Sequence, residues 1–277
     1  MLKRQLIMEK ALELFAKQGF EATSVQQITE QCGISKGAFY LSFKSKDELI
    51  LALIDHFMAQ IISDVDHLVK NTIKSEKLLY EFYFLTFSSF QKHTDFAKIL
   101  ITEQSQFVNK ELLLKTKYYD HLIDKNILSL IDRLYGEERI STKYDLLYSI
   151  KGFMRTYSEL FLFYKLPIDM DLLCKSLVEK TNLLARQTTI PFINQELIDI
   201  LNCPIHEEVS KEQLLKTIEQ KLEEIEESIE KESLQLLKQH LTNPSLSPAI
   251  VKGLLENIRN HPHCKWITYQ LRNYYQL

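Results

Sequence analysis

The fold is decided by TSVQQITEQCGISKGAFYLSFKSKDEL, residues 23–49. Thr23 is followed three residues later by Gln26, which is the capping-box spacing that starts a helix, and Gly33 is suited to end that helix. A further short helix begins after Ser35. Two short helices joined by a tight turn that contains a glycine are typical of a DNA-binding helix-turn-helix.

Helices on both sides of this stretch complete the unit. Apolar residues recur at intervals of three and four over residues 2–18, and Gly19 ends this first helix. A second capping box, Ser45 with Glu48, starts a long helix that continues to about Lys70. The sequence therefore predicts three short helices followed by a long one.

The charge of this segment favours DNA as its partner. Residues 1–46 carry seven Lys and Arg against four Glu, a net charge of +3, although the whole chain has a net charge of −3. Between Gly33 and Lys46 there are three cations and no carboxylate. Because cations that neutralise phosphates release counterions, a local positive charge supplies much of the affinity for DNA.

Helical periodicity continues through the rest of the chain, so we predict an all-α protein. Six Gly and six Pro in 277 residues are too few for an all-β fold rich in tight turns. Residues 207–240 hold ten acidic residues against five lysines, and an apolar stripe predicts one long amphipathic helix there, with one or two short helices after it. Before that segment we expect helices over 75–92, 95–106, 109–135, 142–165 and 169–187.

Several classes of function are disfavoured. The chain has no glycine-rich phosphate loop, no H-E-x-x-H motif and no local Ser-His-Asp signature, so we expect neither an enzyme nor a bound cofactor. Its opening lacks the apolar region of a secretion signal, and no stretch is long enough to span a membrane. The four cysteines are widely spaced, which indicates reduced thiols in a cytoplasmic protein.

Two groups of residues offer zinc-type ligands. One is Cys203 with His206, and the other is His261, His263 and Cys264. Their spacing matches no standard zinc finger, so we predict no metal site, although the sequence leaves open whether the two groups converge.

Three blocks at fixed spacing lie within residues 7–53: Ala11-x-x-Leu14-Phe15-x-x-x-Gly19-Phe20, Thr23-x-Val25-x-x-Ile28 and Gly33-Ile34-Ser35-Lys36-Gly37-Ala38-Phe39-Tyr40-x-x-Phe43-x-Ser45-Lys46-x-x-Leu49. These blocks resemble the N-terminal domain of the TetR/AcrR family of bacterial transcriptional repressors. The resemblance implies a homodimer, a helical C-terminal domain that binds a small effector, and loss of operator binding when the effector binds. It implies an inverted-repeat DNA operator as partner.

The resemblance assigns roles to individual positions. Lys36 and Gly37 start the recognition helix, Tyr40 and Lys46 contact phosphates, and Thr23 is the phosphate-binding cap of the preceding helix. Ala38 and Leu41 replace polar residues that are common in the family, so thymine methyl groups or DNA shape would contribute more to specificity. The full set of expected DNA-binding residues is Thr23, Gln26, Ser35, Lys36, Gly37, Ala38, Tyr40, Leu41, Lys44 and Lys46.

We therefore expect a DNA-binding domain over residues 1–46, an effector-binding and dimerisation domain over 47–190, and a helical extension over 191–277. The extension is expected to pack on the effector domain. Effector-contacting candidates are the aromatic residues Phe84, Phe87, Phe107, Tyr118, Phe153 and Tyr157, which suit a mostly apolar guest. Dimer contacts are expected from Tyr144, Leu147, Ile150 and Met154 on one helix and from Leu173, Leu177 and Leu184 on the next.

An alternative stays open at this point. The helix-turn-helix could be vestigial, and the chain could instead be a helical interaction protein that recruits a partner through its acidic extension. Binding to DNA separates the two hypotheses.

Overall fold

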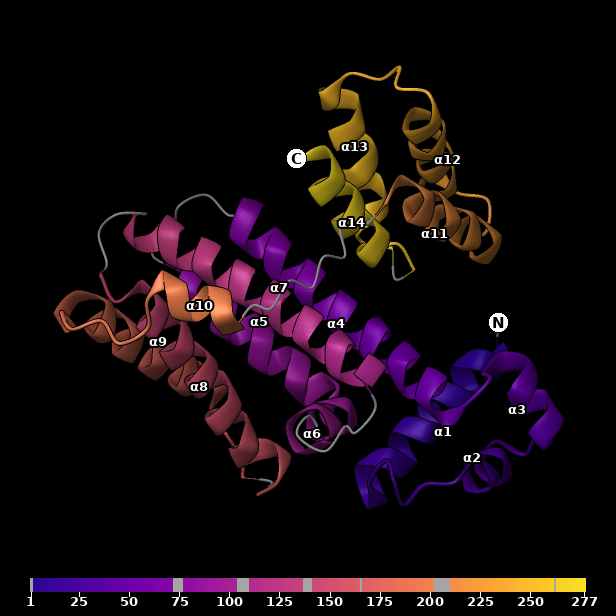
Figure 1. Cartoon of the computed structure of the whole chain (residues 1–277), viewed down its shortest axis with the longest axis horizontal. Coiled ribbons are helices and arrows are strands. Elements are labelled where there is room, and N and C mark those ends of the chain that lie inside the picture. Colours follow the sequence, from indigo (N-terminus) through magenta and orange to yellow (C-terminus); the bar gives the residue numbers. More distant parts are fainter. Residues whose placement is uncertain are drawn as a thin grey trace. The chain divides into compact units, whose positions relative to one another are not determined.

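The computed structural model describes residues 2–71, 77–103, 110–136, 141–164, 166–201, 210–261 and 263–277. Within these ranges every regular element is an α-helix, which confirms the all-α prediction (Figure 1). The chain divides into two compact units, Met1–Ile205 and His206–Leu277, and each is described by itself. Among the described helices, none is long and apolar enough to cross a membrane.

The first three helices form a small head. They are α1 (Leu2–Gln18), α2 (Val25–Cys32) and α3 (Lys36–Ser42). Gly19 and Gly33 end α1 and α2 with φ angles of 87° and 65°, a left-handed conformation that glycine adopts without strain. The head is held together by a small apolar core of Ile7, Ala11, Phe15, Phe20, Ile28, Phe39 and Phe43.

The cap of α2 differs from the sequence prediction by one residue. Ser24, not Thr23, is the N-cap, and Gln27, not Gln26, completes the capping box. The Thr23 hydroxyl instead bonds to the preceding turn, where it donates a 2.7 Å hydrogen bond to the carbonyl of Gly19. At the next predicted box, Ser45 does accept a hydrogen bond from the amide of Glu48 at 3.0 Å.

Six further helices form the body of the first unit. They are α4 (Lys46–Asn71), α5 (Leu78–Lys92), α6 (Thr94–Glu103), α7 (Lys110–Tyr135), α8 (Lys143–Leu162) and α9 (Met170–Gln187). α4 runs from the head into the body, where it packs against α5 and α7, while α6 packs against α1 (Figure 1). The head and the body therefore touch through two helices of the body.

The predicted dimer contacts are largely wrong. Leu147 and Ile150 on α8, and Leu173 and Leu177 on α9, are buried in the core that α8 and α9 form with α4, α5 and α7. α8 and α9 each have an apolar stripe, and on both helices this stripe packs against other helices of the same unit.

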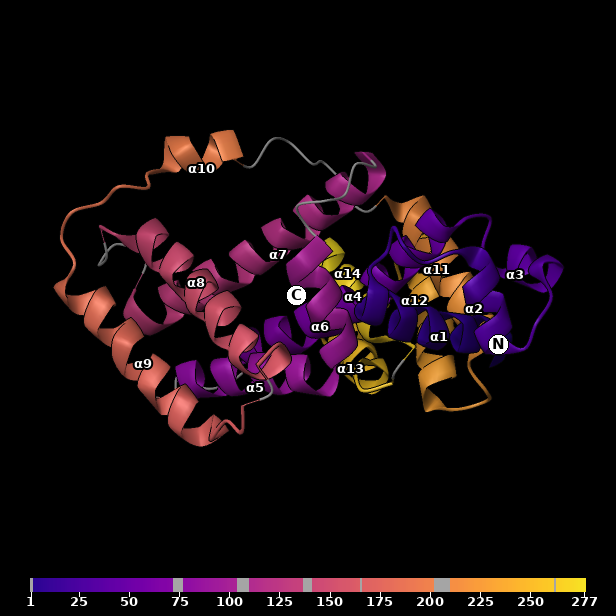
Figure 2. The same cartoon turned by 90° about the horizontal axis from the view of Figure 1, so that it is seen from below.

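A seven-residue helix, α10 (Gln195–Leu201), follows α9 after an extended connection (Figure 2). The connection is fixed by α8, because the Asp145 carboxylate accepts hydrogen bonds from the backbone amides of Phe192 at 3.1 Å and Ile193 at 3.3 Å. Asn194 caps α10 by accepting a hydrogen bond from the amide of Leu197 at 2.9 Å.

The second unit contains α11 (Lys211–Glu224), α12 (Ile229–Thr242), α13 (Pro248–Arg259) and α14 (Lys265–Tyr275). The single acidic helix predicted over 207–240 is wrong, because the chain breaks after Ile225 and Ser228 caps a new helix. The apolar stripe of that segment is used within the unit, where Leu214, Ile218, Leu234 and Leu237 are fully buried together. The extension therefore has its own hydrophobic core.

Candidate nucleic-acid interface and effector pocket

Four of the ten predicted DNA contacts are exposed on α3. Phe39 is fully buried and fixes the helix to the head, while Ser35 caps it by accepting a hydrogen bond from the amide of Ala38 at 3.2 Å. Because Phe39 points inward, the residues on the opposite side point to solvent. Gly37 and Leu41 are exposed on that side, and Lys36 and Tyr40 are exposed beside it.

The exposure of Leu41 is unusual for its type. Its side chain is 91% exposed, and Tyr40 beside it is 53% exposed, although both are large residues next to an apolar core. A leucine held in solvent on a short, well-packed helix is available for apolar contact with a base edge. Gly37 has room for a Cβ, whose nearest neighbour would be the Ser35 hydroxyl at 3.8 Å, so packing within the head does not require a glycine at this position.

The two predicted contacts on or beside α2 have different environments. Thr23 is only 1% exposed, and its hydroxyl also accepts a hydrogen bond from the Gln18 amide at 3.1 Å. Gln26 is exposed, and its amide donates to the Glu30 carboxylate. The structure therefore leaves Gln26 accessible and uses the Thr23 side chain inside the head.

Lys46 is occupied within the head. Its ammonium donates to the carbonyls of Phe20 at 2.7 Å and Thr23 at 2.9 Å, and it lies 4.2 Å from the centre of the Phe20 ring. A phosphate could take this ammonium only at the expense of these contacts. Lys44, by contrast, has an exposed side chain, while its backbone amide donates to Glu48 at 2.7 Å.

Arg4 supports α3 from the first helix, a role that sequence reasoning missed. Its guanidinium donates to the carbonyl of Ser42 at 2.6 Å and lies 4.1 Å from the centre of the Phe43 ring. A cation at the C-terminal end of a helix is favoured by the helix dipole, so Arg4 stabilises the end of α3. The predicted start of α1 at Leu2 is confirmed, but the sequence does not show that this start places Arg4 against the end of α3.

The predicted effector contacts are only partly brought together. Phe87 is fully buried, with its ring 6.2 Å from that of Phe161, and Phe153 and Tyr157 pack on the same cluster. Phe84 is 44% exposed and points away from this cluster, and Tyr118 is buried elsewhere. Phe107 lies outside the described residues.

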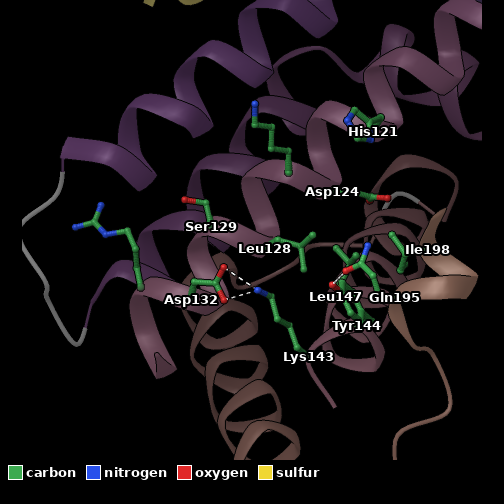
Figure 3. Close-up of a pocket in the computed structure, with 12 residues that line it drawn as sticks. His121, Asp124, Leu128, Ser129, Asp132, Lys143, Tyr144, Leu147, Gln195 and Ile198 are labelled. Atoms are coloured by element: carbon green, nitrogen blue, oxygen red, sulfur yellow. Dashed lines mark hydrogen bonds and ion pairs between the residues drawn. The ribbon is translucent and has the colours of Figure 1, made fainter. Parts of the chain in front are cut away.

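A groove of about 740 Å³ lies between α7, α8 and α10, and none of the predicted effector contacts lines it (Figure 3). Its floor and walls include Leu128 and Asp132 from α7, Lys143 from α8, and Gln195 and Ile198 from α10. The Asp132 carboxylate and the Lys143 ammonium form an ion pair at 2.6 Å inside it.

A second ion pair borders the groove. The buried Asp124 carboxylate accepts a hydrogen bond from Lys151 at 2.6 Å, and burial raises the pKa of Asp124 although this lysine opposes the shift. Sequence reasoning missed the groove because a polar face on α7 looks the same as a solvated one.

No metal centre is found in the part of the chain that the structure describes, where no three His, Cys, Asp or Glu side chains come together. His261 and Cys264 are neighbours, with 3.7 Å between the ring nitrogen and the sulfur. Cys203 and His206 lie outside the described residues, so the convergence of the two groups stays untested.

Comparison with known proteins supports the head in particular. Residues 7–53 match the family model described as bacterial regulatory proteins of the tetR family. The HTH-type transcriptional regulator YerO of Bacillus subtilis is 29% identical over 268 residues, which cover 92% of this chain and 89% of YerO. YuxN from the same organism is 26% identical, covering 92% of this chain and 91% of YuxN.

Solved structures resemble a shorter part of the chain. A TetR/AcrR-family transcriptional regulator of Aquifex aeolicus is 25% identical, with a TM-score of 0.51, and covers 66% of this chain and 99% of its own. The regulator FadR of Bacillus subtilis, solved with stearoyl-CoA, is 21% identical with a TM-score of 0.55, covering 67% of this chain and 99% of its own. About a third of the present chain therefore has no counterpart in these structures, whereas YerO and YuxN match nearly throughout.

Proposed function

We propose that this chain is a dimeric repressor. It belongs to the TetR family of bacterial helix-turn-helix transcriptional regulators, which are not enzymes. In this proposal it binds an inverted-repeat operator and is released by a small, mostly apolar effector. The observation that carries the proposal is the solvent-facing side of α3, where Lys36, Tyr40 and Leu41 surround a capped, well-packed helix start. That arrangement suits insertion into the major groove.

The DNA contacts divide into two kinds. Lys36, Tyr40 and Lys44 are exposed and suit phosphate oxygens, which position the head without reading sequence. Gln26, Ala38 and Leu41 suit base edges, with Leu41 against thymine methyl groups. Thr23 and Lys46 act mainly by holding the start of α2 in place, since their side chains bond within the head.

Dimerisation would use the outer faces of α8 and α9 rather than the buried ones. Tyr148 on α8, Phe163 just after α8, and Leu172 and Leu183 on α9 are large apolar residues that the first unit leaves exposed. Gly152, also exposed on α8, has no atom within 4 Å of an added Cβ, so a partner helix could approach closely there. A two-fold interface of four helices would bury this face.

The effector would act through helices that join the body to the head. The cluster around Phe87, Phe153 and Tyr157 is large and apolar, which suits a lipophilic guest. FadR, a fold neighbour, was solved with stearoyl-CoA, so a long acyl chain has a precedent in this fold. A shift of α6, which packs against α1, or of α4 would change the placement of the two heads.

The test is selection of DNA fragments by the purified full-length protein at about 150 mM salt, where non-specific binding is weak. The proposal predicts recovery of a short inverted repeat. Recovery of nothing above background, from protein shown to be folded and dimeric, would refute it and favour an interaction protein with a silent head.

A further inference from the structure

The face of α7 that meets the groove carries positive as well as negative side chains. His121, Lys125, Ser129 and Arg133 lie there at helical spacing, together with Asp124 and Asp132. Each of these two carboxylates already has a lysine partner at 2.6 Å, Lys151 for Asp124 and Lys143 for Asp132. Among the described residues that line the groove, an added anion would therefore meet no unpaired carboxylate, and the exposed Lys125 would attract it.

The groove also offers apolar surface and enough room for a ligand. Leu128, Leu147 and Ile198 contribute to its lining from α7, α8 and α10 respectively. Its volume of about 740 Å³ lies within the range of sites that hold small molecules. An occupant with both an apolar body and one charged end would use both parts of the lining.

α10 is fixed in the position that closes the groove. Tyr144 donates a hydrogen bond to Gln195, and Asp145 holds the backbone just before α10 through two amides. These contacts come from the first turn of α8, which itself lines the groove through Lys143 and Tyr144. A wall that is anchored by polar contacts is preorganised for binding, because little ordering is left to occur when a ligand arrives.

We propose that this groove binds a small amphiphilic anion, with its carboxylate, sulfonate or phosphate near Lys125 and its apolar body against Leu128 and Ile198. None of the aromatic residues Phe87, Phe153 and Tyr157 lines this groove, although Leu128 packs against the same core, and no residue of α3 lines it. Binding there is independent of whether the protein represses transcription, and it is measured without DNA.

The test is a fluorescence titration of the full-length protein with two dyes. Anilinonaphthalene sulfonate has an aromatic body and one sulfonate, and N-phenylnaphthylamine has the same body without the charge. Lys125→Glu should weaken binding of the sulfonate dye about tenfold and leave the neutral dye within about twofold, because only the sulfonate interacts with the side chain. Ile198→Ser should weaken both dyes, since it removes apolar wall.

Lys117→Glu is the matched control, since Lys117 is also exposed on α7 but does not line the groove. It should leave both dyes within about twofold of the parent. Equal effects of Lys125→Glu and Lys117→Glu on the sulfonate dye would overturn the assignment, as would an equal loss of both dyes on Lys125→Glu. Circular dichroism checks that each variant is folded. Operator binding, measured separately, reports on the repressor proposal alone.

Discussion

Lys36 and Lys46 carry the same charge in different surroundings, so removing each charge should have a different consequence. Lys36 is exposed at the start of α3, and Lys36→Gln should remove a phosphate contact in each protomer. Each lost contact lowers the slope of log affinity against log salt by about 0.9, so a dimer should lose about 1.8. Stability should change by less than about 0.5 kcal/mol, as is usual for exposed sites.

Lys46→Met should instead destabilise the protein. The change removes hydrogen bonds to the carbonyls of Phe20 and Thr23, together with the contact of the ammonium with the Phe20 ring. A bond to a charged group contributes about 1.5–3 kcal/mol, and these bonds share one partly exposed ammonium, so we expect a total loss of about 2 kcal/mol. For a unit of this size the Tm should fall by about 4–8 °C.

The two effects are measured by fluorescence anisotropy on the selected operator between about 50 and 200 mM salt, and by thermal unfolding. Lys252→Gln, an exposed lysine in the second unit, is the charge-matched control and should change neither quantity. The reasoning fails if Lys36→Gln leaves the salt slope unchanged while Lys46→Met lowers it at constant Tm. That result would make Lys46 the phosphate contact and Lys36 a bystander.

Three further predictions concern the protein away from DNA. Tyr83→Phe leaves the buried Thr181 hydroxyl without its 2.7 Å partner and should cost about 1–2 kcal/mol in urea unfolding. Ser228→Ala removes the cap of α12 and should cost about 1 kcal/mol, with faster hydrogen exchange in the first turn of that helix as its signature. Burial raises the pKa of Cys174 to about 11 and of Cys264 to about 12, so at pH 8 iodoacetamide should modify both slowly in the folded chain and quickly in urea. For both cysteines we expect the labelling rate, measured by mass spectrometry, to increase as pH rises. Equal labelling rates in folded and unfolded protein would contradict the burial of these thiols.

The sequence predicts the head well because several independent signals agree there. Apolar spacing, Gly19 and Gly33 all specify three short helices before a long one, and the structure has them. The one error, the cap of α2, arises because TSVQQ contains two overlapping capping boxes. Ser24 is the N-cap, and the Thr23 hydroxyl instead donates to the Gly19 carbonyl. This contact across the turn cannot be read from the local spacing of residues.

Predictions that depend on which face of a helix meets which neighbour fare worse. Periodicity identifies an apolar stripe on α8 and α9, but it cannot distinguish a stripe that packs within one chain from a stripe that packs on a partner. Leu147 and Leu177 belong to the first kind, whereas Leu172 and Leu183 remain exposed. The prediction for the acidic segment is wrong for a similar reason. The apolar stripe changes register near Ile229, and this change marks a break between α11 and α12 rather than one long helix.

The groove beside α10 could not have been predicted, because its polar lining on α7 is what a solvated helix face requires. α10 is distant in sequence from α7. Asp145 and Tyr144 hold α10 in place, and only this placement turns that face of α7 into a wall of the groove. The FadR structure is matched almost completely by 67% of this chain, a length that ends near α9 when counted from the N-terminus. The YerO match leaves out only 8% of the chain, so it must include most of the residues that come after α9. If the groove is a binding site, its ligand need not be the effector of regulators that match only part of this chain.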